Sequence, residues 1–230
     1  MDSYSIKKII YDSGADFCGI ASIDRFTHAP EGFNPADTLP SCKSVIIFGK
    51  KFLRGTLSCN NNIPYTVVRN NLSSLLDLMA VDFCGIMEDN NITAVPIGTI
   101  GPTVKDKITG RTRGIVSLKH AAVLAGLGYI GKNSLLINPD FGNMLWLTGV
   151  LAEIDLEPDP IIDKKCPEDC DLCIKSCPVN AIPSDSTEID QGKCFLHAFH
   201  TNEGESFYFK CHKCRTVCPN CFGSRNKQAG

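Results

Sequence analysis

The sequence has no apolar run long enough to cross a bilayer, no secretory leader pattern and no excess of positive charge. Its longest apolar stretches, residues 121–130 and 144–152, are short and contain glycine, whereas a membrane helix needs about 20 apolar residues. Lys and Arg number 23 against 25 Asp and Glu, and this balance argues against a nucleic-acid partner. These absences predict a cytoplasmic protein with no membrane partner.

The composition is that of a globular protein. The chain has 230 residues, 43% hydrophobic and 21% charged, enough for one large domain or two small ones with a real core. Periodicity and turn residues predict an α/β fold for the first 160 residues. We expect helices at residues 4–14, 67–87 and 117–127, and strands at residues 17–23, 44–48, 92–97, 135–138 and 144–154. An apolar stripe in the second helix predicts a buried face: Leu72, Leu75, Leu76 and Met79.

Cysteine is abundant and unevenly placed. The chain contains 13 cysteines; Cys18, Cys42, Cys59 and Cys84 are scattered, and the other nine lie between residues 166 and 221. The scattered four are expected to be structural, with Cys59 in a polar loop the most exposed. In a reducing compartment, the clustered nine suggest metal binding rather than disulfides.

Two runs in this region share the pattern Cys-x2-Cys-x3-Cys-Pro, which ends the bacterial ferredoxin motif for 4Fe–4S clusters. The first run begins with an x3 gap instead of x2, and the second lacks its first cysteine, for which Cys194 is the natural substitute. In ferredoxins the last cysteine of each run binds the other cluster. Cluster one is therefore assigned to Cys166, Cys170, Cys173 and Cys218, and cluster two to Cys177, Cys194, Cys211 and Cys214.

This assignment leaves Cys221 spare. The alternative is a four-thiolate zinc site formed by Cys211, Cys214, Cys218 and Cys221. Zinc would leave both Cys-Pro pairs unexplained and five other cysteines without a role. The spacing therefore favours iron–sulfur clusters.

A glycine motif stands in the middle of the chain. Gly126, Gly128 and Gly131 match the dinucleotide fingerprint Gly-x-Gly-x-x-Gly, which works between a strand and the start of a helix. Here the motif follows an expected helix and precedes an expected strand, so NAD binding is not predicted. The glycines suit a tight turn or the close approach of another ligand, with Lys132 and Asn133 available at the turn.

Residues 120–138, followed by the two cysteine runs, resemble epoxyqueuosine reductase and, more distantly, corrinoid-dependent reductive dehalogenases. Residues 14–21 and 39–47 fit the same pattern, so the similarity covers nearly the whole chain. Three departures stand out. Residues 111–118 contain no acid where those reductases carry a catalytic aspartate. The chain is expected to lack their C-terminal tRNA-binding extension, and its net charge is not that of a tRNA binder. These departures predict a short relative with a different substrate, or with another corrinoid protein as its electron acceptor.

The resemblance also implies an architecture and a chemistry. It implies a nitroreductase-like α/β domain with a mixed sheet (residues 1–158), a ferredoxin-like module (159–223) and a tail (224–230). A cobalamin or another corrinoid would lie between the domains and receive electrons from the clusters. Implied corrinoid-pocket residues are His120, Gly126, Gly128, Gly131, Lys132 and Asn133, and catalytic candidates are Tyr129 and His120. A histidine in an alanine-rich helix and a tyrosine beside a turn are also common packing residues.

The sequence thus predicts an iron–sulfur oxidoreductase that delivers electrons to a corrinoid for a low-potential reduction. Its partners would be an electron donor of the ferredoxin or flavodoxin type and either a small-molecule substrate or a corrinoid protein. The alternative is a ferredoxin-like electron carrier without an organic cofactor. A cluster-bearing regulatory or structural protein is the third possibility.

Overall fold

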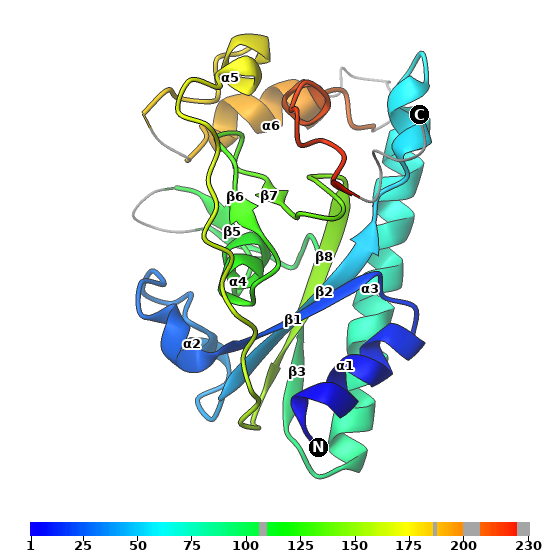
Figure 1. Ribbon diagram of the computed structural model, residues 1–230, viewed down its shortest axis with the longest axis vertical. Helices are drawn as coiled ribbons and strands as arrows, with labels where there is room; N and C mark the ends of the chain where they lie inside the picture. Colours follow the sequence, from blue (N-terminus) through cyan, green and yellow to red (C-terminus); the bar gives the residue numbers. More distant parts are fainter. Residues whose placement is uncertain (106–109, 186–187, 200–207, 225–230) are drawn as a thin grey trace. The chain divides into compact units, whose positions relative to one another are not determined.

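The computed structural model describes residues 1–105, 110–185, 188–199 and 208–224 (Figure 1). Its helices are α1 (Ser3–Asp12), η1 (Ile23–Phe26), α2 (Pro35–Thr38), η2 (Arg54–Ser58), α3 (Ile63–Asp89), α4 (Leu118–Leu124), α5 (Leu172–Ser176), α6 (Gln191–Phe199) and α7 (Lys213–Thr216). Its strands are β1 (Phe17–Ser22), β2 (Ser44–Lys51), β3 (Ala94–Ile97), β4 (Val104–Lys105), β5 (Thr112–Arg113), β6 (Tyr129–Ile130), β7 (Leu136–Ile137) and β8 (Leu145–Ala152). The predicted α/β class is confirmed.

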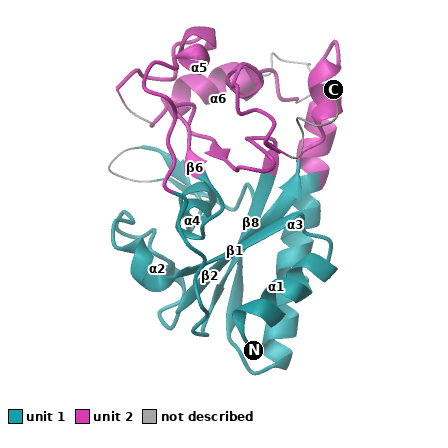
Figure 2. Cartoon of the chain, viewed as in Figure 1, with its two compact units in different colours: residues 1–51, 72–128, 146–162 teal, residues 52–71, 129–145, 163–230 magenta. Residues whose placement is uncertain are grey.

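The chain divides into two compact units that interleave along the sequence (Figure 2). Unit 1 comprises residues 1–51, 72–128 and 146–162; unit 2 comprises residues 52–71, 129–145 and 163–230. Unit 2 thus joins the cysteine-rich region to two earlier segments of the chain. The predicted domains are continuous segments and remain a prediction, and residues 225–230 of the predicted tail lie outside the described residues.

Unit 1 is built on a four-stranded sheet with the order β1-β2-β8-β3. β1 pairs antiparallel with β2, and β3 pairs antiparallel with β8. β2 and β8 are also antiparallel. Lys43, just before β2, donates its N–H to the Ala152 carbonyl at the end of β8, whereas Gly49, near the end of β2, faces the Trp146 carbonyl near the start of β8. The sheet is therefore antiparallel, where the resemblance implied a mixed one.

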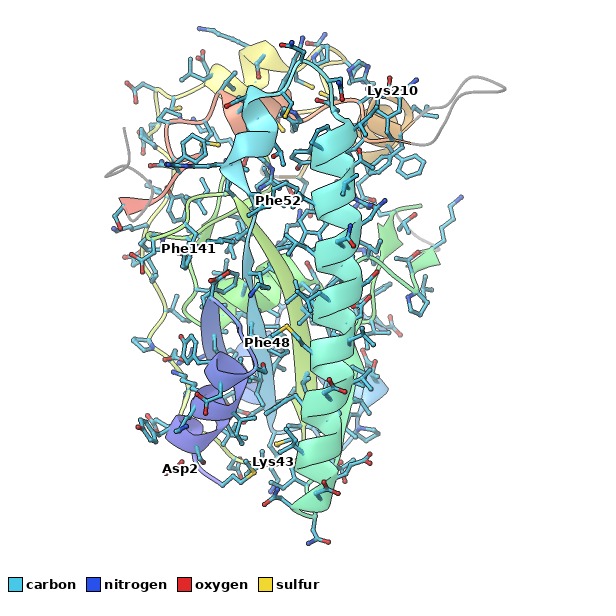
Figure 3. All side chains as sticks on the ribbon, turned by 90° about the vertical axis from the view of Figure 1, so that its right-hand side faces the viewer. Asp2, Lys43, Phe48, Phe52, Phe141 and Lys210 are labelled. Carbon is cyan, nitrogen blue, oxygen red and sulfur yellow. The ribbon has the colours of Figure 1, made fainter. Side chains whose placement is uncertain are left out.

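The core of unit 1 lies between this sheet and the helices α1 and α3. Phe48 of β2 is fully buried and meets Phe83 of α3 edge to face, with ring centroids 6.3 Å apart (Figure 3). On α3, Leu76 and Met79 are buried as predicted, but Leu75 is 43% exposed. The buried face of α3 is centred on Leu76, Ala80 and Phe83, and Leu75 lies at its edge. Among the described helices, none is long and apolar enough to span a bilayer.

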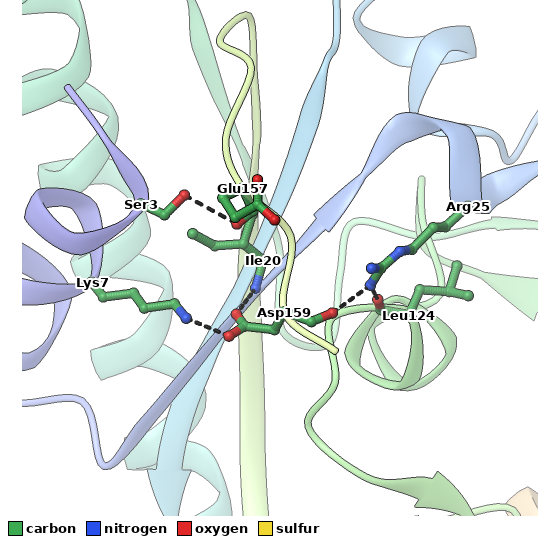
Figure 4. Close-up of polar contacts among 7 residues, drawn as sticks. All are labelled: Ser3, Lys7, Ile20, Arg25, Leu124, Glu157 and Asp159. Carbon is green, nitrogen blue, oxygen red and sulfur yellow. Dashed lines mark hydrogen bonds and ion pairs between the residues drawn. The ribbon is translucent and has the colours of Figure 1, made fainter. Parts of the chain in front are cut away.

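Asp159, the first residue of the predicted ferredoxin-like module, is held firmly within unit 1 (Figure 4). Its carboxylate accepts hydrogen bonds from the Lys7 ammonium (2.5 Å) and from the buried Ile20 N–H (2.9 Å). Arg25 donates to the Asp159 carbonyl (2.7 Å) and to the Leu124 carbonyl (2.5 Å). One aspartate therefore joins α1, β1 and the chain that leaves β8.

Replacing Asp159 with alanine is expected to lower the free energy of unfolding of unit 1 by about 2 kcal/mol, because the buried Ile20 N–H loses its acceptor. Urea unfolding followed by the fluorescence of Trp146, the only tryptophan, measures this change. The control is Asp12→Ala, which breaks an exposed ion pair with Lys8 and should leave the midpoint unchanged. Equal midpoints for both variants would contradict the anchoring role of Asp159.

Candidate metal centres

Four cysteines from both runs line one pocket in unit 2. They are Cys166, Cys170, Cys173 and Cys218, the set that the sequence assigns to cluster one. Lys132, Asn133 and Pro219 line the same pocket. The last cysteine of the second run therefore joins the first three of the first run, the crossover that two-cluster ferredoxins use.

The short helices α5 and α7 produce this crossover. Each lies inside a Cys-x2-Cys-x3-Cys run, and the two helices pack against each other. Cys173 lies on α5 and Cys214 on α7, and each is followed four residues later by the cysteine that precedes proline. Because the residue before a proline disfavours helical conformation, α5 ends at Ser176 and α7 at Thr216, before the last cysteine of each run.

The thiols of the first set influence one another. Burial is the main cause that raises the pKa of Cys173, and the neighbouring Cys166, Cys218 and Cys170 raise it further. The pKa of Cys218 is raised by burial and by Cys166 and Cys170. Four thiolates in so small a space require positive charge, which iron would supply.

Three cysteines of the second set are also neighbours. Burial raises the pKa of Cys214 to about 12, and the nearby Cys194 and Cys211 act in the same direction. Cys177 accepts a hydrogen bond from the Ala181 N–H (3.3 Å). Cys194, Cys211 and Cys214 therefore lie near one another, and the assignment of the second set, with Cys177 as its fourth ligand, remains a prediction.

A stack of rings positions the chain just before α7. Tyr65, at the start of α3, is 2% exposed and stacks on His212 with ring centroids 4.7 Å apart. Thr66 Oγ1 accepts the Phe209 N–H (2.8 Å), and Asn62 Nδ2 donates to the Lys210 carbonyl (2.7 Å). These contacts fix the backbone on both sides of Cys211. They also explain why residues 52–71 belong to unit 2.

The zinc alternative fits the structure less well. Cys218, one of its four ligands, lines the pocket of Cys166, Cys170 and Cys173. Cys221 is 3% exposed, and its backbone bonds Cys218 and Asn143. Burial is the main cause that raises the pKa of Cys221 to about 11. Cys221 therefore has a packing role in unit 2.

The Gly-Lys-Asn turn, residues 131–133, contacts both cysteine runs. Lys132 Nζ donates to three carbonyls of the first run, and Asn133 Nδ2 donates to the Cys214 carbonyl in the second (2.9 Å). Both side chains were predicted to face a corrinoid, and both are engaged with the cysteine runs. A Cβ at Gly131 would lie 2.8 Å from Asn133 Oδ1 and 2.8 Å from Ile137 Cδ1, so a larger residue there would require these side chains to shift.

The other glycine candidates lie in unit 1 and serve the local backbone. Gly126 has φ of +71°, and a Cβ there would lie 2.4 Å from the Pro160 carbonyl. Gly128 has φ of 155°, also in the region that favours glycine. Both follow α4 and precede β6 and β7, as the sequence predicted, so the context of a dinucleotide fingerprint is absent.

The two catalytic candidates lie in different units. His120, on α4 in unit 1, has Nδ1 2.7 Å from Ser117 Oγ. Tyr129, on β6 in unit 2, accepts a hydrogen bond from Asn220 Nδ2 (3.3 Å). The pKa of Tyr129 is raised by burial first and then by Cys166, Cys218 and Cys170, so its phenol stays protonated at neutral pH. Tyr129 is therefore close to the first cysteine set.

Two supporting residues were not predicted from the sequence. Arg215 is 7% exposed, donates to the Asn143 carbonyl and lies over the Phe52 ring at 5.9 Å. Asn143 N–H bonds the carbonyls of Asn220 and Cys221, and its side chain donates to the Arg215 carbonyl (3.3 Å). No local signal separates Arg215 from Lys175, which also lies inside a cysteine run and is 74% exposed.

The fold and the cysteine arrangement define a class: an α/β protein that carries a ferredoxin-like, cysteine-rich module. No protein-family model matches the chain.

The predicted resemblance to epoxyqueuosine reductases is confirmed by sequence. The chain is 32% identical over 125 residues to epoxyqueuosine reductase of Staphylococcus aureus and 35% identical over 118 residues to that of Cyclobacterium marinum. The alignments cover 50% and 46% of this chain, but only 32% and 38% of those relatives.

Solved structures show the same fold. The epoxyqueuosine reductase of Streptococcus thermophilus superposes with a TM-score of 0.63 at 18% identity, covering 94% of this chain and 65% of that one. A catabolic reductive dehalogenase superposes with a TM-score of 0.66 at 18% identity, covering 94% of this chain and 31% of that one. Another neighbour is an epoxyqueuosine reductase bound to a tRNA stem loop (TM-score 0.61, 20% identity, 94% of this chain and 64% of that one). These likenesses establish the fold.

Proposed function

We propose that the chain is an iron–sulfur oxidoreductase that holds two 4Fe–4S clusters and passes electrons to a bound corrinoid for a low-potential reduction. The observation that carries the proposal is the single pocket lined by Cys166, Cys170, Cys173 and Cys218, which come from two separate runs. The named curated relatives are reductases, which supports an assignment to reductive chemistry.

The residues present fit the clusters. Cysteine thiolates are the usual ligands of such clusters, and the first set supplies four around one pocket. Cys194, Cys211 and Cys214 are close enough to influence one another, as a second site requires. When bound, the clusters would supply one-electron transfer at potentials that charge, hydrogen bonds and burial adjust. The protein positions the cysteines and limits their contact with water.

The corrinoid part of the proposal rests on the fold and not on particular side chains. Two of the six candidate residues, Lys132 and Asn133, have described hydrogen bonds to the cysteine runs. One structural neighbour is a reductive dehalogenase whose description names B12-dependent dehalogenation (TM-score 0.64, 18% identity).

The proposed partners follow from the same chemistry. A low-potential donor of the ferredoxin or flavodoxin type would reduce the clusters, and a small molecule or a corrinoid protein would be the final acceptor. The net charge of −2 argues against a nucleic-acid partner. Because a structural neighbour binds a tRNA stem loop, RNA binding by this chain should nevertheless be measured. Binding of a tRNA stem loop by this chain would overturn the prediction drawn from its charge.

Equilibrium dialysis against hydroxocobalamin tests the corrinoid proposal. Protein purified without oxygen and carrying both clusters is expected to retain about one corrinoid per chain. The control is the Cys218→Ala protein, which should lose one cluster and still bind the corrinoid if the corrinoid contacts lie elsewhere. Two clusters with no retained corrinoid would contradict the proposal and favour the electron-carrier alternative.

A further inference from the structure

Lys132 uses its whole hydrogen-bonding capacity on one loop. Its Nζ lies 3.1 Å from the Pro167 carbonyl, 2.8 Å from the Glu168 carbonyl and 2.8 Å from the Cys170 carbonyl. A lysine ammonium has three donors and no acceptor, so these three bonds occupy it completely. All three acceptors belong to the stretch that carries Cys166 and Cys170.

This loop has little regular structure of its own. It contains the x3 gap, one residue longer than in the ferredoxin motif. In the described stretch 166–170, one backbone hydrogen bond joins the Cys170 N–H to the Pro167 carbonyl (3.2 Å). No helix or strand covers these five residues. A ligand loop without secondary structure depends on outside contacts for its conformation, and Lys132 supplies three of them.

The neighbouring residue serves the other run. Asn133 is 4% exposed and donates to the Cys214 carbonyl of the second run. The described hydrogen bonds of the Lys132 side chain all go to the first run. Consecutive residues of one turn therefore support different cysteine runs. This division allows the contribution of Lys132 to be separated from that of the rest of the turn.

We propose that Lys132 is the positioning residue for cluster one: it holds the Cys166–Cys170 loop in ligand geometry and places a positive charge beside that cluster. The inference rests on the proposed two-cluster function. A nearby cation stabilises the more negative, reduced cluster and so raises its reduction potential. Cluster two does not depend on this contact.

The test compares Lys132→Met, which keeps length and removes charge and donors, with Lys132→Arg, which keeps the charge. Cluster potentials are measured by dithionite titration with electron paramagnetic resonance, and iron release is measured with a chelator. In Lys132→Met, cluster one should shift to lower potential and release iron at least about tenfold faster, with cluster two unchanged. Lys132→Arg should keep the potential of cluster one and its rate of iron release closer to the wild-type values than Lys132→Met does.

Lys175→Met is the matched control. Lys175 lies between two cysteines of the first run, but its side chain is 74% exposed and pairs with Asp171 at 2.8 Å. The Lys175→Met variant should leave the reduction potentials of both clusters unchanged. Three results would overturn the inference: wild-type behaviour of Lys132→Met, equal loss of both clusters in that variant, or the same shift in Lys175→Met. A wild-type protein without iron would instead overturn the two-cluster function itself.

Discussion

Replacing Cys218 with alanine is expected to lower the iron content from about eight to about four per chain, because one complete cluster loses a ligand. The reason is structural: Cys218 belongs to the second run but lines the pocket of Cys166, Cys170 and Cys173. Iron and acid-labile sulfide assays on anaerobically purified protein measure the change. The remaining cluster should be the one bound by the second set.

Cys221→Ala is the matched control for Cys218→Ala. Cys221 lies three residues further along and is also a cysteine of the second region, but it is 3% exposed and has a packing role. Its replacement should leave iron and sulfide at wild-type levels. Loss of iron in Cys221→Ala, with full retention in Cys218→Ala, would contradict the crossover and make Cys221 the cluster ligand in place of Cys218.

Replacing Cys194 with alanine is the second prediction with a large expected effect. Cys194 stands on α6, outside the second run, and is close enough to Cys214 to raise its pKa, as Cys211 is. Its loss should remove cluster two and leave about four irons per chain, bound as cluster one. Electron paramagnetic resonance of the reduced protein distinguishes this product from that of Cys218→Ala.

Two further variants make the Cys194 result decisive. Cys177→Ala should give the same spectrum as Cys194→Ala if both cysteines bind cluster two. Cys59→Ala, at an exposed cysteine of unit 2 outside both runs, should match the wild type. Full iron content in Cys194→Ala would show that the second run finds its missing ligand elsewhere.

The main helices and strands could be predicted because their signals are local. Periodic apolar residues located α3, and β-branched residues located β2, each within a few residues of its ends. The two-residue strands β4, β5, β6 and β7 carry too little pattern, and β7 alone coincides with a predicted strand. Exposure of Leu75 was missed because the sequence shows that Leu75 belongs to an apolar stripe but does not show which side of that stripe packs on the sheet.

The cysteine sets could be predicted because ligand spacing is a property of the sequence. The roles of Lys132 and Asn133 could not, because their partners lie 35 to 81 residues away. A resemblance suggested a ligand-facing turn, and the structure shows hydrogen bonds from the same turn to the cysteine runs. Nothing in the local sequence separates these two uses of a glycine turn.

Interleaved units are equally hard to predict from a single sequence. Residues 52–71 and 129–145 contain no cysteine except Cys59, so composition gave no reason to join them to the cysteine-rich region. Tyr65 shows why they belong there: its ring packs on Phe209 at 5.4 Å and on His212 at 4.7 Å. Such long-range contacts become visible only in the folded chain.

Iron and acid-labile sulfide per chain, measured on protein purified without oxygen, test the central claim most directly. The account predicts about eight irons and about eight sulfides per chain, with absorption near 400 nm that dithionite bleaches. One zinc per chain with no sulfide would contradict it.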